Sequence, residues 1–402
     1  MNMNSKISRA FSFFIYIIGM GAFLLSDIVI SKYYPLDDIA LWAFLKSIML
    51  LAASTVILGL DQVLLRRPET LMSIWRYMIL RVLFLSFLVS FVVVLIKPVS
   101  IYFVFVLIVS LAFISLSYSI YRGALKMNRA QISLNGWKVI FFVSVCWSVA
   151  SESIYNIEGV IIFSVLVSLL GVLVVAMHRK DWVSYYLVKS REGSIAPKEL
   201  ILKEAKYFFL QTVGLNLSVN FEQILLNFFG FTDSSANLFV HFSVFLPLVV
   251  FLNGFIGFYL GPYLREKKDS INITFFKKIN LIFILIGLGL SLISYCFGSF
   301  AFDYFYSDKY ELNNMLAALI VILGFLRLYY VIPSALIGVA SSTKRLIQFS
   351  KFNIAALALS FLIFVFLVFL NVNPVISVMF SSITNWGVRV VTGLFISYQR
   401  VR

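Results

Sequence analysis

Long apolar segments recur along the whole chain, and they constrain its fold more than any other feature. A helix needs about 20 mostly apolar residues to cross the hydrocarbon core of a bilayer. Runs of that length occur from one end of this 402-residue sequence to the other. Because backbone N–H and C=O groups inside a bilayer must be paired within the protein, such runs fold as helices. We therefore predict an all-α, polytopic membrane protein whose N-terminal apolar run is a retained first helix.

The apolar runs predict about 12 membrane-spanning helices. Their expected ranges are 10–31, 39–60, 76–96, 100–120, 137–151, 159–177, 207–229, 237–260, 279–298, 313–335, 352–371 and 375–396. Pro247 and Pro333 fall inside the eighth and tenth ranges. Proline lacks the N–H that a helix uses for hydrogen bonding, so both positions predict kinks.

Composition and missing motifs exclude several classes of function. The chain is 61% hydrophobic and 13% charged, whereas soluble domains are nearer half apolar and a quarter charged. The net charge of +15 is typical of basic cytoplasmic loops and does not indicate a nucleic-acid partner. The sequence has no GxxxxGK[ST], HExxH, GxSxG or DxD motif, and its two cysteines and two histidines form no metal-binding spacing. We therefore predict no catalytic residue, no metal site, no cofactor and no enzyme activity.

The distribution of basic residues predicts the orientation. If the N-terminus lies in the cytoplasm, most of the 33 Lys and Arg residues fall in cytoplasmic segments, with Lys138 at the inner end of the fifth span. The outer loops then hold only Lys32, Lys97 and Lys309. Cytoplasmic loops are enriched in Lys and Arg, so both termini are expected in the cytoplasm.

The longest loop, 178–206, divides the chain into two predicted six-helix lobes, 1–195 (which includes the cytoplasmic linker) and 196–402. Shifting the first half along the second by 195 positions places Asp27 on Glu222 and Lys46 on His241. An acid and a basic or near-basic group at one shared offset indicate an internal duplication. Each half has an even number of helices, so the repeats are parallel, as in transporters that bind substrate between two halves.

Two acids, Asp27 and Glu222, lie inside spans. A charged side chain at the centre of a membrane helix costs about 2.5–3.5 kcal/mol on insertion scales and often marks an ion or substrate pathway. We predict ion-coupling roles for both acids. The alternative is solvation near the outer interface, or a structural pair with Lys46. A polar stripe shares the helix of Glu222 and predicts either a partner helix or a wet cavity; it comprises Asn216, Asn220, Gln223 and Asn227.

Four basic residues are candidates for binding an anionic substrate. Lys46, Arg327 and Arg389 lie inside spans, and Arg81 lies at the inner end of the third. The guanidinium group suits phosphate because of its forked geometry. The alternatives are a buried ion pair for Arg327, contact with the inner headgroups for Arg389, and an interface position for Arg81.

Four stretches resemble the Wzx-type O-antigen flippases of the multidrug/oligosaccharidyl-lipid/polysaccharide exporter superfamily. They are LGLD with LLR at 58–66, NFEQILL at 220–226, GPYL at 261–264, where proline is expected to end the eighth helix, and the aromatic run at 302–310. In the second stretch Glu222 replaces the aspartate that is usual in the family. The topology of two six-helix lobes with short outer loops is similar as well.

The resemblance implies a V-shaped exporter that flips an undecaprenyl-pyrophosphate-linked oligosaccharide across the bacterial inner membrane by alternating access. Lipopolysaccharide and O-antigen biosynthesis are the implied pathways. The implied substrate is the lipid-linked oligosaccharide, the implied coupling ion is H⁺ or Na⁺, and membrane lipids, a polysaccharide polymerase and a chain-length regulator are the implied partners.

Two other functions remain open on the residues alone. An integral-membrane polysaccharide polymerase or ligase of the same pathway also has about 12 helices, but such enzymes tend to have a large outer loop that carries arginines. A multidrug exporter of the same superfamily would favour an acidic or aromatic cavity, whereas Lys46, Arg327 and Arg389 favour an anionic substrate.

Overall fold

The computed structural model describes residues 3–66, 70–124, 126–151, 156–178, 188, 198–266, 271–340 and 343–401, and within these ranges every regular element is a helix. The chain forms two compact units, Met1–Asn216 and Leu217–Arg402. The predicted domain boundary at 195/196 lies outside the described residues.

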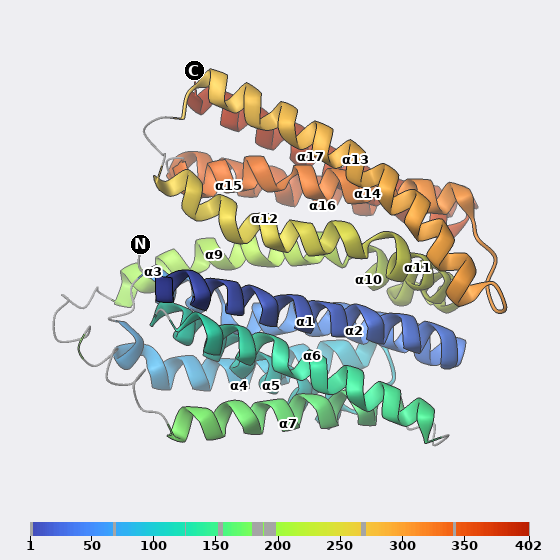
Figure 1. Cartoon of the computed structure of the whole chain (residues 1–402), viewed down its shortest axis with the longest axis horizontal. Helices are drawn as coiled ribbons and strands as arrows, with labels where there is room; N and C mark the ends of the chain where they lie inside the picture. Colours follow the sequence, from blue (N-terminus) through green and yellow to red (C-terminus); the bar gives the residue numbers. More distant parts are fainter. Residues whose placement is uncertain are drawn as a thin grey trace. The chain divides into compact units, whose positions relative to one another are not determined.

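The first unit is built around α5. Its helices are α1 (Met3–Tyr33), α2 (Leu36–Ile57), α3 (Leu60–Arg66), α4 (Leu71–Ile96), α5 (Ile101–Gly123), α6 (Met127–Ala150) and α7 (Ile157–His178), together with the larger part of α9 (Lys198–Val219) (Figure 1). Helix α5 contacts α2, α3, α4, α6 and α7, and α1 packs along α6. The pairing of α1 with α6 brings together residues more than 100 positions apart, and it positions the polar groups described in the next section.

The second unit is built around α17. It contains the end of α9 and then α10 (Phe221–Phe228), α11 (Thr232–Phe245), α12 (Pro247–Glu266), α13 (Ile273–Tyr306), α14 (Asn314–Tyr329), α15 (Val331–Ala340), α16 (Thr343–Phe369) and α17 (Pro374–Val401) (Figure 1). Helix α17 contacts α10, α14, α15 and α16. These contacts place side chains of α10, α14 and α17 next to one another.

The polytopic, all-helical prediction is confirmed. Within the described residues, 10 helices are long and apolar enough to cross a membrane, or 11 if the bent pair α11 and α12 forms one span. The predicted seventh span, 207–229, is not a single helix, because Asn220 separates α9 from α10. The first turns of α9 also carry charged side chains, which lowers its apolarity.

The kink predicted at Pro247 is confirmed. The segments Thr232–Phe245 and Pro247–Asn253 are bent by 63° at this point. In the tenth span α14 ends at Tyr329 and α15 begins at Val331, and Pro333 lacks the N–H that would bond back to Tyr329.

The expectation that Pro262 ends the eighth helix is wrong. Helix α12 passes through Pro262 and ends at Glu266. Proline removes one helix hydrogen bond, but its fixed φ of about −65° is one that a helix uses. In membrane helices, neighbouring groups often satisfy the carbonyl that proline leaves free.

The fifth span begins earlier than expected. It was predicted at 137–151, but α6 begins at Met127, and Met127–Ala150 forms a candidate span. The residues before 137 resemble a loop because they are polar, yet Gln131, Ser133 and Asn135 are buried. Lys138 therefore lies near the middle of a candidate span and not at its end.

The LGLD stretch forms a left-handed turn after α2. Leu58 and Gly59 have φ values of 56° and 72°. A Cβ atom on Gly59 would lie 2.7 Å from the carbonyl oxygen of Ala205 and 2.7 Å from the amide nitrogen of Phe209. Glycine is required here both for the backbone angle and for the close approach of α9. Desolvation at this turn raises the pKa of the Asp61 carboxyl.

Candidate functional site

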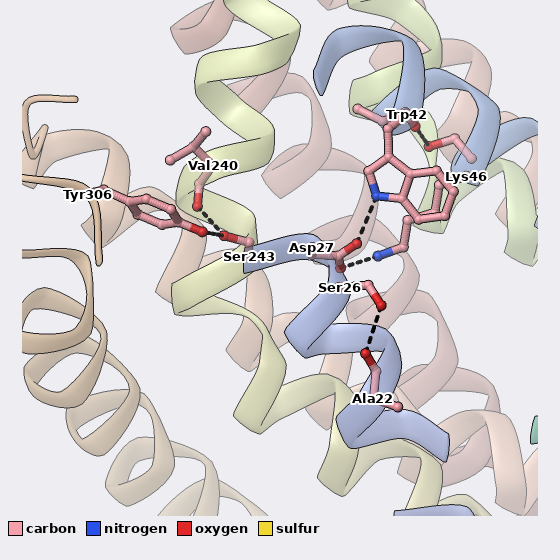
Figure 2. A network of polar contacts seen from close by, with 10 residues as sticks. Ala22, Ser26, Asp27, Trp42, Lys46, Val240, Ser243 and Tyr306 are labelled. Carbon is pink, nitrogen blue, oxygen red and sulfur yellow. Dashed lines mark hydrogen bonds and ion pairs between the residues drawn. The ribbon is translucent and has the colours of Figure 1, made fainter. Parts of the chain in front are cut away.

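In the first unit, the Asp27 carboxylate is buried on α1, with 2% of the residue exposed. The indole Nε1 of Trp42 donates a hydrogen bond to its Oδ1 at 2.9 Å, and the Lys46 ammonium forms an ion pair with its Oδ2. Figure 2 shows both groups reaching from α2 toward Asp27. Both oxygens of this carboxylate are therefore engaged by groups of the neighbouring helix.

A second buried cation, Lys138, lies close to this pair. The Phe23 ring on α1 has the Lys46 Nζ 4.4 Å and the Lys138 Nζ 5.8 Å from its centre. Lys138 donates a hydrogen bond to Asn135 Oδ1 at 2.9 Å, and the Asn135 amide donates in turn to Gln131 Oε1 at 2.8 Å. The sequence prediction missed Lys138 as a site residue because it assigned this lysine to a cytoplasmic segment.

Aromatic rings enclose the cluster of the first unit. Trp42 stacks on Phe141 with ring centres 4.6 Å apart, and Phe23 meets Trp137 edge to face at 5.2 Å. These rings exclude water from one side of the charged groups. The electrostatic interactions among those groups are therefore stronger than they would be in water.

In the second unit, the Glu222 carboxylate on α10 is buried, with 1% of the residue exposed. Its Oε1 accepts from Arg327 Nη2 on α14 at 2.6 Å and from Ser382 Oγ on α17 at 2.5 Å. Arg327 Nη2 also donates to the Val219 carbonyl oxygen at 3.2 Å. The structure thus brings two predicted site residues, Glu222 and Arg327, into one buried ion pair.

Arg389 lies close to this ion pair, because Arg389 and Arg327 both contact the ring of Trp386. The guanidinium carbons of Arg327 and Arg389 lie 5.5 Å and 5.6 Å from the centre of the Trp386 ring. Arg389 is completely buried, and it donates to Asn385 Oδ1 at 3.0 Å and to the Asn353 carbonyl oxygen at 3.2 Å. Its guanidinium group is held inside the unit, and no part of the residue is exposed.

Several polar atoms of the second cluster have unused hydrogen-bonding capacity. Each is buried and has no partner among the described residues; they are Glu222 Oε2, Arg327 Nε, Asn353 Oδ1, Asn385 Nδ2 and Trp386 Nε1. Buried polar atoms in native proteins are nearly always hydrogen-bonded to protein or water. These donors and acceptors are suited to a polar or charged ligand group.

His241, which the 195-residue shift aligns with Lys46, makes hydrogen-bonding and packing contacts away from Glu222. Its Nδ1 lies 2.9 Å from the Asn237 carbonyl oxygen, and its Nε2 lies 3.3 Å from the Asn313 amide nitrogen. Its ring also packs on Phe302, with ring centres 4.7 Å apart. The cation next to Glu222 is Arg327, and no described contact joins His241 to Glu222.

The structure does not place Arg81 with the buried charges. Its guanidinium carbon lies 4.5 Å from the centre of the Tyr77 ring. Arg81 lines a separate cavity of about 270 Å³ in the first unit, together with Leu58, Leu60, Leu202, Ala205, Lys206 and Phe209. No described hydrogen bond or ion pair joins it to Asp27 or Lys46.

The polar stripe around Glu222 contacts a partner helix. Ser235 on α11 donates to Gln223 Oε1 at 2.6 Å, and Asn227 Nδ2 donates to Ser235 Oγ at 2.7 Å. Asn216 donates to Ser54 Oγ at 2.7 Å within the first unit. Gln223 and Asn227 thus fasten α10 to α11, which is one of the two alternatives that the stripe predicted.

The aromatic run at 302–310 fastens the end of α13 to α11. The Tyr306 hydroxyl lies 2.9 Å from Ser243 Oγ, as Figure 2 shows. Phe302 packs on His241 in the same region. This stretch therefore supports the packing of the second unit.

Comparison with known proteins identifies the fold. No protein-family model and no curated protein sequence matches the chain. Among solved structures, the chain is similar to the lipid II flippase MurJ in an inward closed conformation, with a TM-score of 0.63, 13% identity, and coverage of 97% of this chain and 87% of that chain. The chain has the fold of a membrane transporter.

Two MATE transporters are similar in structure to the chain as well. The eukaryotic MATE transporter AtDTX14 matches with a TM-score of 0.60 and 15% identity, over 99% of this chain and 98% of that one. An outward-facing multidrug resistance MATE family transporter of the MOP superfamily matches with a TM-score of 0.60 and 16% identity, over 98% and 95%. These three structures are transporters or flippases, and none of them is an enzyme.

Proposed function

We propose that the protein is a flippase of the Wzx type, which moves an undecaprenyl-pyrophosphate-linked oligosaccharide across the bacterial inner membrane by alternating access. The observation that carries this proposal is an excess of buried cations in each unit. Lys46 and Lys138 accompany Asp27, and Arg327 and Arg389 accompany Glu222.

This excess favours an anionic substrate. Isolated charges are costly to bury, so buried cations normally have anionic partners. One carboxylate in each cluster balances one cation and leaves a formal charge of +1 when both basic groups are protonated. Arginine is the residue best suited to bind phosphate oxygens in a bidentate way. A pyrophosphate group would supply the negative charge that each cluster needs.

The ion pairs suggest how binding and ion coupling are linked. Lys46 and Arg327 are engaged by Asp27 and Glu222 in this conformation. A substrate phosphate that binds either cation competes with the carboxylate for it. The released carboxylate can then take up H⁺ or Na⁺. Arg389 is the third proposed substrate-binding residue, and Arg81, in its separate cavity, is a fourth.

The protein is expected to lie in the bacterial inner membrane together with other proteins of its pathway. Both termini are expected in the cytoplasm, because that orientation puts most basic residues inside. The lipid part of the substrate is expected to stay in the bilayer. A polysaccharide polymerase and a chain-length regulator of the same pathway are the expected protein partners, in O-antigen or a related surface polysaccharide pathway.

The second candidate is a multidrug exporter, which the likeness to MATE transporters favours. The excess of buried cations argues against it, because typical multidrug substrates of such pumps are themselves cationic and would be repelled.

A deletion strain distinguishes these functions. Surface polysaccharide and lipid-linked intermediates are extracted from the deletion strain, from wild type and from the complemented strain. Loss of surface polymer with lipid-linked single units retained inside supports the flippase. Single units that still reach the surface indicate a polymerase. Unchanged polymer with increased sensitivity to drugs indicates a multidrug exporter.

A further inference from the structure

Lys138 occupies an unusual place for a lysine. It lies near the middle of α6, a candidate membrane span, and 8% of the residue is exposed. Burial disfavours the charged form of lysine, because an ammonium group loses its hydration. A lysine in this position needs strong partners to keep its proton.

The partners of Lys138 are neutral. Its Nζ donates to Asn135 Oδ1 at 2.9 Å and lies 3.3 Å from Met20 Sδ, and the Phe23 ring is 5.8 Å away. A thioether sulfur is a weak hydrogen-bond acceptor. No carboxylate contacts Lys138 among the described residues.

A neighbouring ammonium opposes the charged form further. Lys46 Nζ lies over the same Phe23 ring, at 4.4 Å. Asp27, the one carboxylate of this cluster, is engaged by both Lys46 and Trp42. It neutralises one ammonium group, so a proton on Lys138 adds an uncompensated positive charge.

Among the side chains that the structure describes, the other charged groups on α6 and on the helices that pack against it lie toward the helix ends. They are Arg129 on α6, Lys32 on α1, Arg122 on α5 and Glu158 on α7. Tyrosines on the same helices are titratable as well, among them Tyr16 on α1 and Tyr118 and Tyr121 on α5. None of these side chains forms a described hydrogen bond or ion pair with Lys138, whereas Lys46 lies over the same Phe23 ring.

We infer that Lys138 is a proton-exchange site. When the Lys138 amine is neutral, the cluster formed by Asp27, Lys46 and Lys138 has no net charge. As an anion enters, the Nζ lone pair takes up a proton from the aqueous phase, so that the three side chains together carry one positive charge that the anion balances. This inference deepens the proposed function, on which it rests for the identity of the anion.

Arg389 shows why the inference applies to the first unit alone. It is the second cation of the other cluster and is also buried beside an aromatic ring. A guanidinium group stays protonated in proteins, whereas a buried lysine exchanges its proton readily. Proton uptake at Lys138 therefore raises the affinity of the first unit for phosphate, while the charge of the second unit stays fixed.

The test observes lysine side chains directly. The full-length protein, with nitrogen-15 at the lysine Nζ atoms, is placed in lipid nanodiscs without substrate and studied by solid-state NMR from about pH 6 to about pH 9. Neutral amine and ammonium nitrogens have different chemical shifts. We expect one neutral-amine signal, which disappears as the pH falls and is absent from Lys138→Met. The exposed Lys278 supplies the control, because Lys278→Met should keep the signal.

A second variant, Lys138→Arg, is included in case Lys138→Met fails to fold. Lys138→Arg keeps a positive charge and should also lack the neutral-amine signal. Ammonium signals alone over the whole pH range would overturn the inference, as would a neutral-amine signal that persists in Lys138→Arg. The NMR measurement needs no transport substrate, so its failure leaves the flippase proposal standing, and failure of the deletion experiment leaves the proton site standing.

Discussion

The two units of the molecule solve the same electrostatic problem with different side chains. The first holds Asp27, Lys46 and Lys138 around Phe23, and the second holds Glu222, Arg327 and Arg389 around Trp386. Each cluster has one carboxylate and two basic groups, and its two basic groups share one aromatic ring. Both lie on helices within the apolar part of the chain.

The difference between the clusters lies in their ability to change charge. Lysine can lose its proton when its surroundings disfavour the ammonium, whereas arginine cannot. The first cluster can therefore lose its excess positive charge when a lysine releases its proton, whereas the second cluster keeps its charge. Two clusters with the same types of charged group can therefore differ in whether their net charge changes with protonation.

The largest effect is expected from Glu222→Gln. This change keeps the shape but leaves Arg327 and Arg389 without a carboxylate, and breaking a buried ion pair in this way costs about 3–5 kcal/mol. The free energy of unfolding, measured by denaturant titration in micelles, should fall by that amount. The double variant Glu222→Gln/Arg327→Met should recover much of the loss. If the double variant is no more stable than the single one, the unpaired charge is not the cause.

A smaller effect is expected from Asp27→Asn. Here the lysines can lose protons, so the cost falls to about 1–3 kcal/mol, typical of an unsatisfied buried polar group. The same unfolding titration, run beside Glu222→Gln, gives the ratio of the two effects. Equal losses in the two variants would remove the distinction between a cluster that changes charge and one that does not.

Substitutions at Arg389 test whether polymer export needs the permanent positive charge of the second unit. Arg389→Ala should lower the rate of polymer export at least about tenfold, equivalent to about 1.4 kcal/mol. Arg389→Lys should retain export at low pH and lose it as the pH rises, because the new ammonium can lose its proton. Export is measured from surface polysaccharide at matched expression, with Lys278→Ala as the exposed-charge control. Full, pH-independent export in Arg389→Lys would contradict a need for a permanent charge.

The aromatic rings should give the smallest effects. Trp386→Leu and Phe23→Leu each remove two cation–π contacts, worth about 0.5–2 kcal/mol depending on desolvation, and tryptophan is the stronger partner. Thermal unfolding in nanodiscs should show a larger destabilisation for Trp386→Leu. The exposed Phe300 provides a matched control, because Phe300→Leu removes a ring that faces outward. A larger effect at Phe23 would reverse the expected order.

The sequence predicted several site residues for a physical reason. Asp27, Glu222 and Arg327 are conspicuous because charged side chains are expensive inside apolar runs. Lys138 escaped notice because the residues before it are polar and resemble a loop. The missing signal was the spacing of Gln131, Asn135 and Lys138, which step by four and then three and so share one face of a helix.

The internal repeat also shows the limits of sequence alone. The 195-residue offset aligns Lys46 with His241, but the cation that binds Glu222 is Arg327, from α14. An offset compares positions along the chain, whereas the partner of a carboxylate is decided by the helix that packs beside it.

The all-helical membrane fold and the bend at Pro247 can be predicted from local sequence alone. These features depend on local properties, namely the length of an apolar run and the missing N–H of proline. The pairing of the buried charges, in contrast, depends on how the helices pack. Glu222 and Arg327 are brought together by the packing of α10 and α14 beside α17, and Lys138 is placed near Lys46 by the packing of α1 against α6. Ion pairs and shared rings join residues far apart in the chain, so their partners follow from helix packing and not from local sequence.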